Sequence, residues 1–587
     1  MRYELISPMN FNRTALETIL ANRNIPKEEM QHYLHTTDDD INDWRALGED
    51  AIKEGIAALL LTIRSNLDAI FIVDCDCDGY TSSAILINYL YDLFPNWVLN
   101  HVIWFMHEGK EHGLEDFPID KIDVDKVGIV ICADSASNDY AQHKLLLDEE
   151  IKVLILDHHE APYLSDHAIT INSQFRNYPN KMLSGAGVAW QFCRAMDEVF
   201  EEDKAQEYID LCALGLLADM MSLTSIETKH LINQGLTAIK NPFFRSMVTQ
   251  NSYSIGDIVT PFGVAFYVAP YINAVVRSGT LEEKQIIFKA MLKQEANKKI
   301  PSTKRGHKQD EMETIVTQAV RTAVNVKNRQ KRAEDKGLEI LEELIVENDM
   351  LKEPVLMFTL EKSKIEPNIR GLAANRLMAK YQRPIMVLVR TVNKDGKEVY
   401  AGSARGYKRD KIQDFRGFLE QSGLVNYAQG HKMAMGVEVS IENTENLKEY
   451  FRQVYKDAPK EPTYYVDYIL NDNTFKSEII EDIGNCKMLW GQDFDESYIV
   501  LEGVEIPAES IHVLSKNNKY RVQILYKGIE IIKFNLTEEE IDFWQQIKGS
   551  IVLNILGTCT VNEWYGRITP QLLIKDTEVL KTKKYVF

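Results

Sequence analysis

The chain has 587 residues, of which 45% are apolar and 26% are charged, which is ordinary for a globular protein but too long for a single hydrophobic core. No run of about 18 uncharged apolar residues is present, which excludes a membrane-spanning helix. The net charge of −20 excludes a surface that coats nucleic acid with uniform positive charge, so any contact with phosphates must be local.

Residues 1–66 are predicted to form short amphipathic helices that lead into the first large domain. Their beginning lacks the basic segment and apolar segment of a secretory signal peptide. The seven cysteines of the whole chain form no CxxC pair and lie in apolar segments, which is typical of free thiols in a reducing compartment. We therefore expect a cytoplasmic protein without disulfides.

Three segments between residues 67 and 280 share one pattern, in which an apolar run of strand type ends in acidic or histidine residues. They are DAIFIVDCDCDG, VGIVICADSASND and IKVLILDHHEAP. A helix is predicted after the first of them, with Thr81 as its N-cap. Strands that alternate with helices predict a parallel α/β sheet, and ligands of such sheets bind at the carboxyl ends of the strands.

The remainder of the chain is predicted to contain three further parts. Residues 281–350 are charged and helical, and we expect a long helix pair interrupted near Pro301 and Gly306. Residues 351–459 form a smaller α/β domain, with strands in PVLMFTL and PIMVLVRTV and a helix between them. From residue 460 to 587 alternating strands predict a small β-barrel.

Asp74, Asp76 and Asp78 alternate with small residues just after the first strand, an arrangement that suits a hard divalent cation. An acidic loop of this kind is about equally often only a solvated surface. Cys75 and Cys77 lie between the aspartates, and strand alternation predicts that their side chains point away from the ligand face.

Asp157, His158 and His159 supply a carboxylate and two imidazoles at another strand end. Asp134 ends a third strand, and Asp219 ends an apolar helix, where an unpaired carboxylate is costly and calls for a cation. Together these groups can hold two cations about 3.5 to 4 Å apart, the arrangement that hydrolyses phosphoesters. Oxygen-rich ligation with histidine favours Mn²⁺ or Mg²⁺ over a structural zinc ion.

The four segments DCDCDG, ADSAS, LDHHE and GLLADMMSL resemble, in order and spacing, the signature motifs of the DHH phosphoesterase superfamily. ILANRNIP, LSGAGVAWQF, VAPYINAVVRSG, GSARGY and AQGHKMAMG resemble one branch of it, the RecJ-type single-strand-specific exonucleases. NEWYGRITPQLLIKD resembles the final strands of the OB-fold of that family. The resemblance therefore covers nearly the whole chain.

The resemblance implies metal ligands at six positions and contacts with the scissile phosphate at others. The implied ligands are Asp74, Asp76, Asp78, Asp134, His158 and Asp219. His159, Arg277 and Asp134 are the expected catalytic residues, since His159 would lie near the phosphate and a guanidinium pairs bidentately with phosphate oxygens. Without the family, Arg277 would be interpreted as a surface residue.

The resemblance also implies substrate-binding residues, mostly in the smaller domain. They are Asn273, Ser403, Arg405, Gly430, His431 and Gly436. Trp564 and Tyr565 are interpreted equally well as stacking platforms for bases or as core residues of the barrel. The basic residues near Lys304 line a DNA channel or, as is more common, form a solvated loop.

Several positions depart from the family pattern. Gln429 replaces the first of two glycines, Met435 replaces the second of two alanines, and Ser135 and Ala136 stand where the family has Asn-Gly. A tryptophan-histidine element is Ile365-Glu366 here. None of these changes removes an implied metal ligand, but they affect contacts with the DNA end and suggest a divergent, phage-encoded member.

The sequence thus predicts a multidomain α/β protein with five parts: a helical lead-in (1–66), a parallel-sheet DHH domain (67–280), a helical connector (281–350), a smaller DHHA1-like α/β domain (351–459) that closes a groove over the substrate, and an OB-fold β-barrel (460–587). The expected activity is metal-dependent 5′ to 3′ hydrolysis of single-stranded DNA to 5′-mononucleotides, in recombination and repair. A helicase or a single-strand-binding protein is the expected partner, and no membrane is involved.

Two alternatives stay open at this point. One is a DHH phosphodiesterase that cuts short oligonucleotides or cyclic dinucleotides, whose usual two-domain form lacks an OB-fold. The other is a DNA-binding scaffold with a dead site, in which some metal ligands should be lost.

Overall fold

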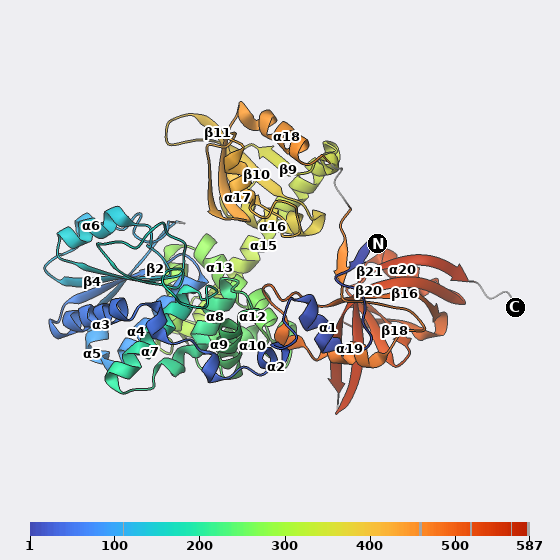
Figure 1. Ribbon diagram of the computed structural model, residues 1–587, viewed down its shortest axis with the longest axis horizontal. Coiled ribbons are helices and arrows are strands. Elements are labelled where there is room, and N and C mark those ends of the chain that lie inside the picture. The colour runs from blue at the N-terminus through green and yellow to red at the C-terminus, as the bar shows by residue number, and fades with distance from the viewer. Residues whose placement is uncertain (110, 457–460, 517–518, 565, 584–587) are drawn as a thin grey trace. The chain divides into compact units, whose positions relative to one another are not determined.

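The computed structural model describes residues 1–109, 111–456, 461–516, 519–564 and 566–583. The chain consists of two compact units (Figure 1). The smaller unit comprises Met1–Glu4 and Lys327–Tyr465, and the larger unit comprises Leu5–Val326 and Val466–Phe587. No helix in the described ranges is long and apolar enough to cross a membrane. All seven cysteines lie in these ranges and are buried free thiols.

A five-stranded parallel sheet with the strand order β3-β2-β4-β5-β6 forms the centre of residues 67–280. Its strands are β2 (Asp68–Val73), β3 (Val102–Met106), β4 (Val127–Ala133), β5 (Lys152–Asp157) and β6 (Ile169–Asn172). The strands are apolar because both faces of a parallel sheet are covered. The predicted parallel α/β sheet is therefore confirmed.

Alternate residues of each strand enter different cores on the two faces of the sheet. Phe71 and Ile131 pack into the core that contains helix α3 (Glu49–Arg64) and helix α4 (Cys77–Leu93), whereas Ile72 and Val130 pack with helix α6 (Tyr140–Asp148). Figure 1 shows α6 on one side of β4 and α3 on the other. This layering leaves the carboxyl ends of the strands free for a ligand.

Helix α4 begins four residues before the predicted N-cap. Asp76 caps it, because its carboxylate accepts the backbone N–H of Gly79 at 3.0 Å. Thr81 lies inside the helix, and its hydroxyl donates to the carbonyl of Cys77 at 3.1 Å. Gly79 also lies inside the helix; a Cβ there would lie 2.6 Å from Cβ of Asp74, so the glycine permits close packing.

Further helices belong to the larger unit. They are α1 (Ala15–Asn22), α2 (Met30–Leu34), α5 (Pro95–His101), α7 (Gly185–Phe200), α8 (Ile209–Ala218), α9 (Ile226–Thr237), α10 (Pro242–Gln250), α11 (Ser252–Ile255), α12 (Pro261–Tyr267), α13 (Ala269–Ser278), α14 (Leu281–Met291), α19 (Ser477–Gly484) and α20 (Glu538–Gln545). Helix α8 is buried from residue 209 to 217, which agrees with a sequence that is apolar apart from Asp210.

The expected helix pair after residue 281 forms as one short helix and one long helix, with a hairpin between them. Helix α14 packs into the core of the larger unit through Ile287 and Phe288. Strands β7 (Lys299–Pro301) and β8 (Met312–Thr314) pair antiparallel, and the 33-residue helix α15 (Ile315–Glu347) follows. The expected interruption near Pro301 and Gly306 is this hairpin, in which Pro301 ends the first strand.

The smaller unit contains a five-stranded sheet with the order β12-β13-β11-β10-β9. Its strands are β9 (Leu356–Leu360), β10 (Ile385–Val392), β11 (Glu398–Arg405), β12 (Tyr427–His431) and β13 (Ala434–Ser440). Two hydrophobic cores cover this sheet, one on each face. The helices that contribute to them include α16 (Pro367–Tyr381), α17 (Phe415–Gln421) and α18 (Asn443–Val454). This matches the predicted second α/β region.

The C-terminal residues form a seven-stranded mixed sheet with the order β15-β16-β20-β21-β19-β18-β17. Its strands are β15 (Tyr468–Leu470), β16 (Tyr498–Pro507), β17 (Ile511–Lys516), β18 (Lys519–Tyr526), β19 (Ile529–Phe534), β20 (Ser550–Trp564) and β21 (Arg567–Lys583). Tyr565 and the side chain of Trp564 lie outside the described residues, so the structure does not place these two predicted stacking groups.

Buried contacts join this sheet to the N-terminal part of the larger unit. Arg23, at the end of α1, binds Asp467 in a fully buried ion pair and donates to the carbonyl of Asp495 at 2.7 Å. The ring of Tyr33 stacks on that of Phe494 with 5.5 Å between their centroids. One continuous core therefore includes residues from both stretches of the larger unit.

Candidate metal centre

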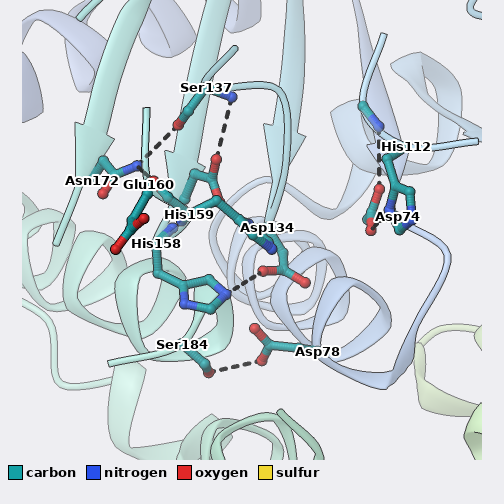
Figure 2. Close-up of polar contacts among 12 residues, drawn as sticks. Asp74, Asp78, His112, Asp134, Ser137, His158, His159, Glu160, Asn172 and Ser184 are labelled. Atoms are coloured by element: carbon teal, nitrogen blue, oxygen red, sulfur yellow. Dashed lines mark hydrogen bonds and ion pairs between the residues drawn. The ribbon is translucent and has the colours of Figure 1, made fainter. Parts of the chain in front are cut away.

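Three strand ends and one helix end meet at the candidate site. Strands β2, β4 and β5 are neighbours in the sheet, so the residues that follow them, Asp74, Asp134 and His158, lie at the same edge (Figure 2). Asp219 is the C-cap of helix α8. Residues from four distant segments are thus brought together by the sheet order.

His158 is at the centre of the polar contacts. Its Nε2 lies 3.1 Å from Oδ1 of Asp134 and 3.3 Å from Oδ2 of Asp219. Asp78 lies close by, where its Oδ1 accepts the hydroxyl of Ser184 at 2.8 Å. Figure 2 shows the carboxylates of Asp78 and Asp134 pointing toward the same space as the imidazole of His158.

The ligand atoms form four overlapping groups, in each of which all atoms lie within 4.8 Å of one another. The groups are Asp134-Asp157-His158-His159, Asp78-His158-Asp219, Asp74-Asp76-Asp134 and Asp74-Cys75-His112. All six residues expected as ligands occur in the first three. The structure therefore brings them together, and their role as ligands stays a prediction.

The charges of this cluster make a bound cation favourable. Burial, followed by the charge of Asp76, raises the pKa of Asp78 to about 6. Burial and the charge of Asp78 raise the pKa of Asp134 and of Asp219 well above the usual value. Among the described residues, the buried Oδ2 of Asp78 has no hydrogen-bond donor. Buried carboxylates that repel one another, with an oxygen that has no donor, fit a divalent cation.

Asp157 positions the two histidines. Its Oδ1 accepts the backbone N–H groups of His158 at 2.7 Å and His159 at 3.2 Å and contacts Nδ1 of His159 at 2.8 Å. Although burial opposes ionisation, the charge of His159 holds the pKa of Asp157 well below its usual range. Burial likewise opposes protonation of His159, but Asp157 raises the pKa of that imidazole to about 9. His159 is therefore a partly exposed cation at neutral pH.

Two glycines allow helices to approach the carboxylates. A Cβ at Gly185 in α7 would lie 2.5 Å from Cβ of Asp134, and a Cβ at Gly215 in α8 would lie 2.3 Å from Oδ1 of Asp78. Separations under about 3 Å require something to move, so only glycine fits at these positions.

Asn273 and Arg277 occupy successive turns of helix α13. The side-chain oxygen of Asn273 accepts the backbone N–H of Cys77 at 3.0 Å, at the first residue of α4. Asn273 thus holds the acidic loop directly, a positioning contact that the sequence did not predict. Arg277 is exposed four residues later, where residues of this spacing share one helix face.

Four of the five substrate-binding positions predicted in the smaller unit share one face of its sheet, whereas Gly430 is paired with Met435 on the other side. Ser403 is paired with Gly436, and Arg405 with Ala434, which is itself paired with His431. Paired residues of antiparallel strands, and residues two apart on one strand, point to the same side. The structure therefore groups Ser403, Arg405 and His431 around Gly436.

Glycines keep this face accessible. A Cβ at Gly436 would meet no atom closer than 3.9 Å, so the face is open there, and Gly430 has a φ of +127° that a side chain would strain. Gly371 in α16 allows the helix to approach Arg405, whose Nη2 would lie 2.7 Å from a Cβ at that position. This surface has room for the backbone of a ligand.

His112 and Cys75 also lie beside Asp74, although the sequence did not predict either residue as part of the site. Nδ1 of His112 lies 2.9 Å from Oδ2 of Asp74, and Sγ of Cys75 lies 3.5 Å from both ring nitrogens of His112. The expectation that Cys75 points away was wrong because β2 ends at Val73, so strand alternation does not extend to residue 75. The feature of the sequence that could have indicated His112 is a His-Gly pair in the polar segment that follows a strand.

The loop that carries His112 is anchored from helix α14. The buried Nζ of Lys284 donates to the carbonyls of His107, Glu108 and Gly109 at 2.9, 2.8 and 3.2 Å. Gly113 donates its N–H to Oδ1 of Asp74 at 3.2 Å. Backbone hydrogen bonds thus hold the residues before His112, at 107–109, and the residue after it, Gly113.

The basic residues predicted near Lys304 lie on the β7–β8 hairpin. Lys299 is on β7, and Lys304, Arg305 and Lys308 are exposed in the turn that follows. Lys298 pairs with Glu295 at the base of the hairpin. The structure places these residues on one exposed ribbon and leaves both earlier interpretations open.

The chain matches two known families and several known proteins. Residues 69–216 match the DHH family, N-terminal domain, and residues 466–576 match the RecJ OB domain. The chain is 32% identical over 587 residues, 100% of this chain and 99% of the relative, to the "Putative SPbeta prophage-derived single-strand DNA-specific exonuclease YorK" of Bacillus subtilis. It is 24% identical over 566 residues, 94% of this chain and 66% of the relative, to the single-stranded-DNA-specific exonuclease RecJ of the same species.

The fold has a counterpart among solved structures. The crystal structure of RecJ from Thermus thermophilus in complex with Mn²⁺ matches with a TM-score of 0.67 and 17% identity, over 97% of this chain and 76% of that chain. The complex with Mg²⁺ matches with a TM-score of 0.62 and the same identity, over 100% of this chain and 79% of that chain. At this identity the likeness establishes the fold.

Proposed function

The chain belongs to the family of RecJ-type single-strand DNA-specific exonucleases, and from this premise we propose that it is a metal-dependent exodeoxyribonuclease that degrades single-stranded DNA from 5′ to 3′. The products would be 5′-mononucleotides. The observation that carries the proposal is the convergence of carboxylates and imidazoles from four segments on one buried cluster. A role in recombination and repair, with a helicase or a single-strand-binding protein as partner, is part of the same proposal.

Two divalent cations, Mn²⁺ or Mg²⁺, fit the donor set of the cluster. The proposed ligands are Asp74, Asp76, Asp78, Asp134, His158 and Asp219. When bound, the cations would polarise the phosphate and activate water for hydrolysis. The carboxylates that repel one another in the buried cluster support this assignment, because a cation relieves that repulsion.

His159 supplies positive charge next to the proposed cations. Asp157 holds the ring through Nδ1, which leaves Nε2 free to donate to a phosphate oxygen. A donor that is already charged and oriented stabilises negative charge that develops on the phosphate during hydrolysis.

Arg277 is proposed to contact a neighbouring phosphate, and Asn273 to hold the acidic loop through its contact with Cys77. In the smaller unit, the face that carries Ser403, Arg405 and His431 is proposed to bind the DNA backbone. The open position at Gly436 on this face supports the assignment, since it lets a phosphate approach the backbone there.

Digestion of end-labelled DNA tests the proposal. Single-stranded and duplex substrates labelled at the 5′ or the 3′ end are incubated with the full chain and Mn²⁺ or Mg²⁺. We expect early release of a labelled mononucleotide only from 5′-labelled single strands. Asp134→Asn should abolish release, whereas Asp148→Asn, which changes an exposed aspartate of α6, should not.

Other outcomes would redirect the assignment. Release first from the 3′ label would overturn the polarity but keep the nuclease. Cleavage confined to very short oligonucleotides or cyclic dinucleotides would indicate a phosphodiesterase of the wider superfamily. Tight binding of single strands with no cleavage in either metal would indicate a scaffold.

A further inference from the structure

A cluster with a different ligand chemistry adjoins the proposed cation site. It consists of Asp74, Cys75 and His112, whose ligand atoms lie within 4.8 Å of one another. Cys75 and His112 are not among the six proposed ligands of the catalytic cations. In the described part of the chain, no other cysteine belongs to such a group.

The ligand atoms are close enough to share one tetrahedral ion after the exposed imidazole of His112 rotates. Zn–S bonds of about 2.3 Å and Zn–N bonds of about 2.0 Å, at a tetrahedral angle, separate the two ligand atoms by about 3.5 Å. Sγ of Cys75 is 3.5 Å from both ring nitrogens of His112 and so lies over the ring, and the exposed imidazole must rotate to direct Nδ1 at the shared ion. Nδ1 of His112 is 2.9 Å from Oδ2 of Asp74, and that pair needs only to open by about half an ångström to admit the ion.

The donor types select against the proposed catalytic cations. A thiolate and an imidazole favour Zn²⁺ or Cd²⁺, whereas Mg²⁺ and Mn²⁺ prefer carboxylate and water oxygens. The site is also accessible, because the side chain of His112 is 64% exposed. A water molecule can supply the fourth ligand, as it does in zinc sites with three protein ligands.

We propose that Asp74, Cys75 and His112 form a site for a thiophilic divalent cation, Zn²⁺ or Cd²⁺, which shares Asp74 with the candidate metal centre and inhibits hydrolysis when filled. Asp74 is also grouped with Asp76 and Asp134. An ion held by Cys75 and His112 therefore draws one carboxylate away from that group. The inhibition rests on the proposed function; the binding does not. The thiol proton and the proton that Nδ1 of His112 shares with Asp74 pass to solvent when the ion binds.

A spectroscopic titration tests the binding without reference to activity. Cd²⁺ is added to the full chain in excess Mg²⁺, and the thiolate-to-metal charge-transfer absorbance in the ultraviolet is recorded. The wild type should show a saturable band. Cys75→Ala should lose it, while Cys77→Ala should keep it, because Cys77 is buried in the core beside the same aspartates.

A second variant covers the case in which Cys75→Ala fails to fold. His112→Gln alters an exposed side chain and should weaken Cd²⁺ binding at least about tenfold. A band that persists in Cys75→Ala, or no band in the folded wild type, would overturn the site.

The inhibition is measured as the Zn²⁺ concentration that halves cleavage in Mn²⁺. Cys75→Ala should require at least about tenfold more Zn²⁺ than the wild type. Equal sensitivity of the two proteins would overturn the inhibition. A wild type that shows the Cd²⁺ band but cleaves no DNA in Mn²⁺ would contradict the proposed function and leave the binding site standing.

Discussion

At the scale of single residues, Asp134 combines backbone strain with the chemistry of the candidate metal centre. Its φ is +73°, an unfavourable region for a residue with a Cβ. The backbone N–H of Asp134 donates to the carbonyl of Leu156 at 2.8 Å, and its carboxylate contacts His158. Strain of about 1 to 2 kcal/mol is thus held by the neighbouring strand, at the point where a ligand is needed.

Asp157→Asn tests whether this carboxylate orients the histidines. The amide keeps the shape but removes the charge that raises the pKa of His159. We expect kcat on single-stranded DNA to fall about 10- to 100-fold while the protein stays folded. The measurement is steady-state cleavage in Mn²⁺ with the melting temperature as a control. An unchanged kcat would show that Asp157 has only a structural role.

His143 should make stability depend on pH. Burial lowers its pKa from 6.5 to about 4, so the unfolded chain binds the proton more tightly. Stability is then fully present above pH 6.5 and is lost as the pH falls toward 4. At pH 5 the free energy of unfolding is about 2 kcal/mol lower than it is well above pH 6.5.

Urea unfolding at pH 7.5 and pH 5 measures the effect. His143→Leu should lose about 2 kcal/mol less than the wild type between the two pH values, whatever its absolute stability. Identical losses would show that His143 does not titrate in this range.

At the scale of elements, helix packing depends on close approach. Gly215 places α8 against α4 and α7, where an added Cβ would lie 2.4 Å from Cβ of Ala186 and 2.6 Å from Oγ1 of Thr81. These neighbours are buried, so they cannot move away into solvent. Asp78 in the first turn of α4 and Asp219 at the end of α8 keep their relative positions only while the helices remain this close.

Gly215→Ala should therefore destabilise the larger unit by about 2 to 3 kcal/mol and reduce cleavage. Gly337→Ala is the matched control, since Gly337 lies within helix α15 and its Cβ would come closest to Ile369 of α16, at an ordinary contact distance of 3.4 Å. That change should be neutral or stabilise by about 0.5 to 1 kcal/mol. Both are measured by urea unfolding. Equal effects would argue against the packing explanation.

At the scale of the whole molecule, the larger unit joins two distant stretches of chain. The buried pair between Arg23 and Asp467 lies at this junction, and Asn22 adds a hydrogen bond to the same carboxylate at 2.8 Å. A buried ion pair adds little net stability but is costly to break on one side. The pair thus links the end of α1 to Asp467, the residue that precedes the first strand of the C-terminal sheet.

Arg23→Met should leave the carboxylate of Asp467 without its charged partner and lower stability by about 3 to 5 kcal/mol. Arg23→Met combined with Asp467→Leu should recover much of this loss, because no buried charge remains. Limited proteolysis and urea unfolding give the comparison. A double variant as unstable as the single one would show that packing, rather than charge, dominates.

The sequence by itself determined the elements and the identity of the reactive groups. Apolar runs that end in Asp74, Asp134 and Asp157 predicted parallel strands with acidic carboxyl ends, and these strands form as expected. Local patterns suffice here because burial on both faces demands a continuous apolar run. The family resemblance added the order of the domains.

Only the tertiary structure decided which of these groups meet. Strand order places β3 beside β2, and so brings His112 to Asp74 and Cys75, although no local pattern records which strands are neighbours. Likewise, Asn273 reaches Cys77 from a helix almost two hundred residues later in the chain. Such contacts depend on packing between distant segments, whereas periodicity and capping act over a few residues.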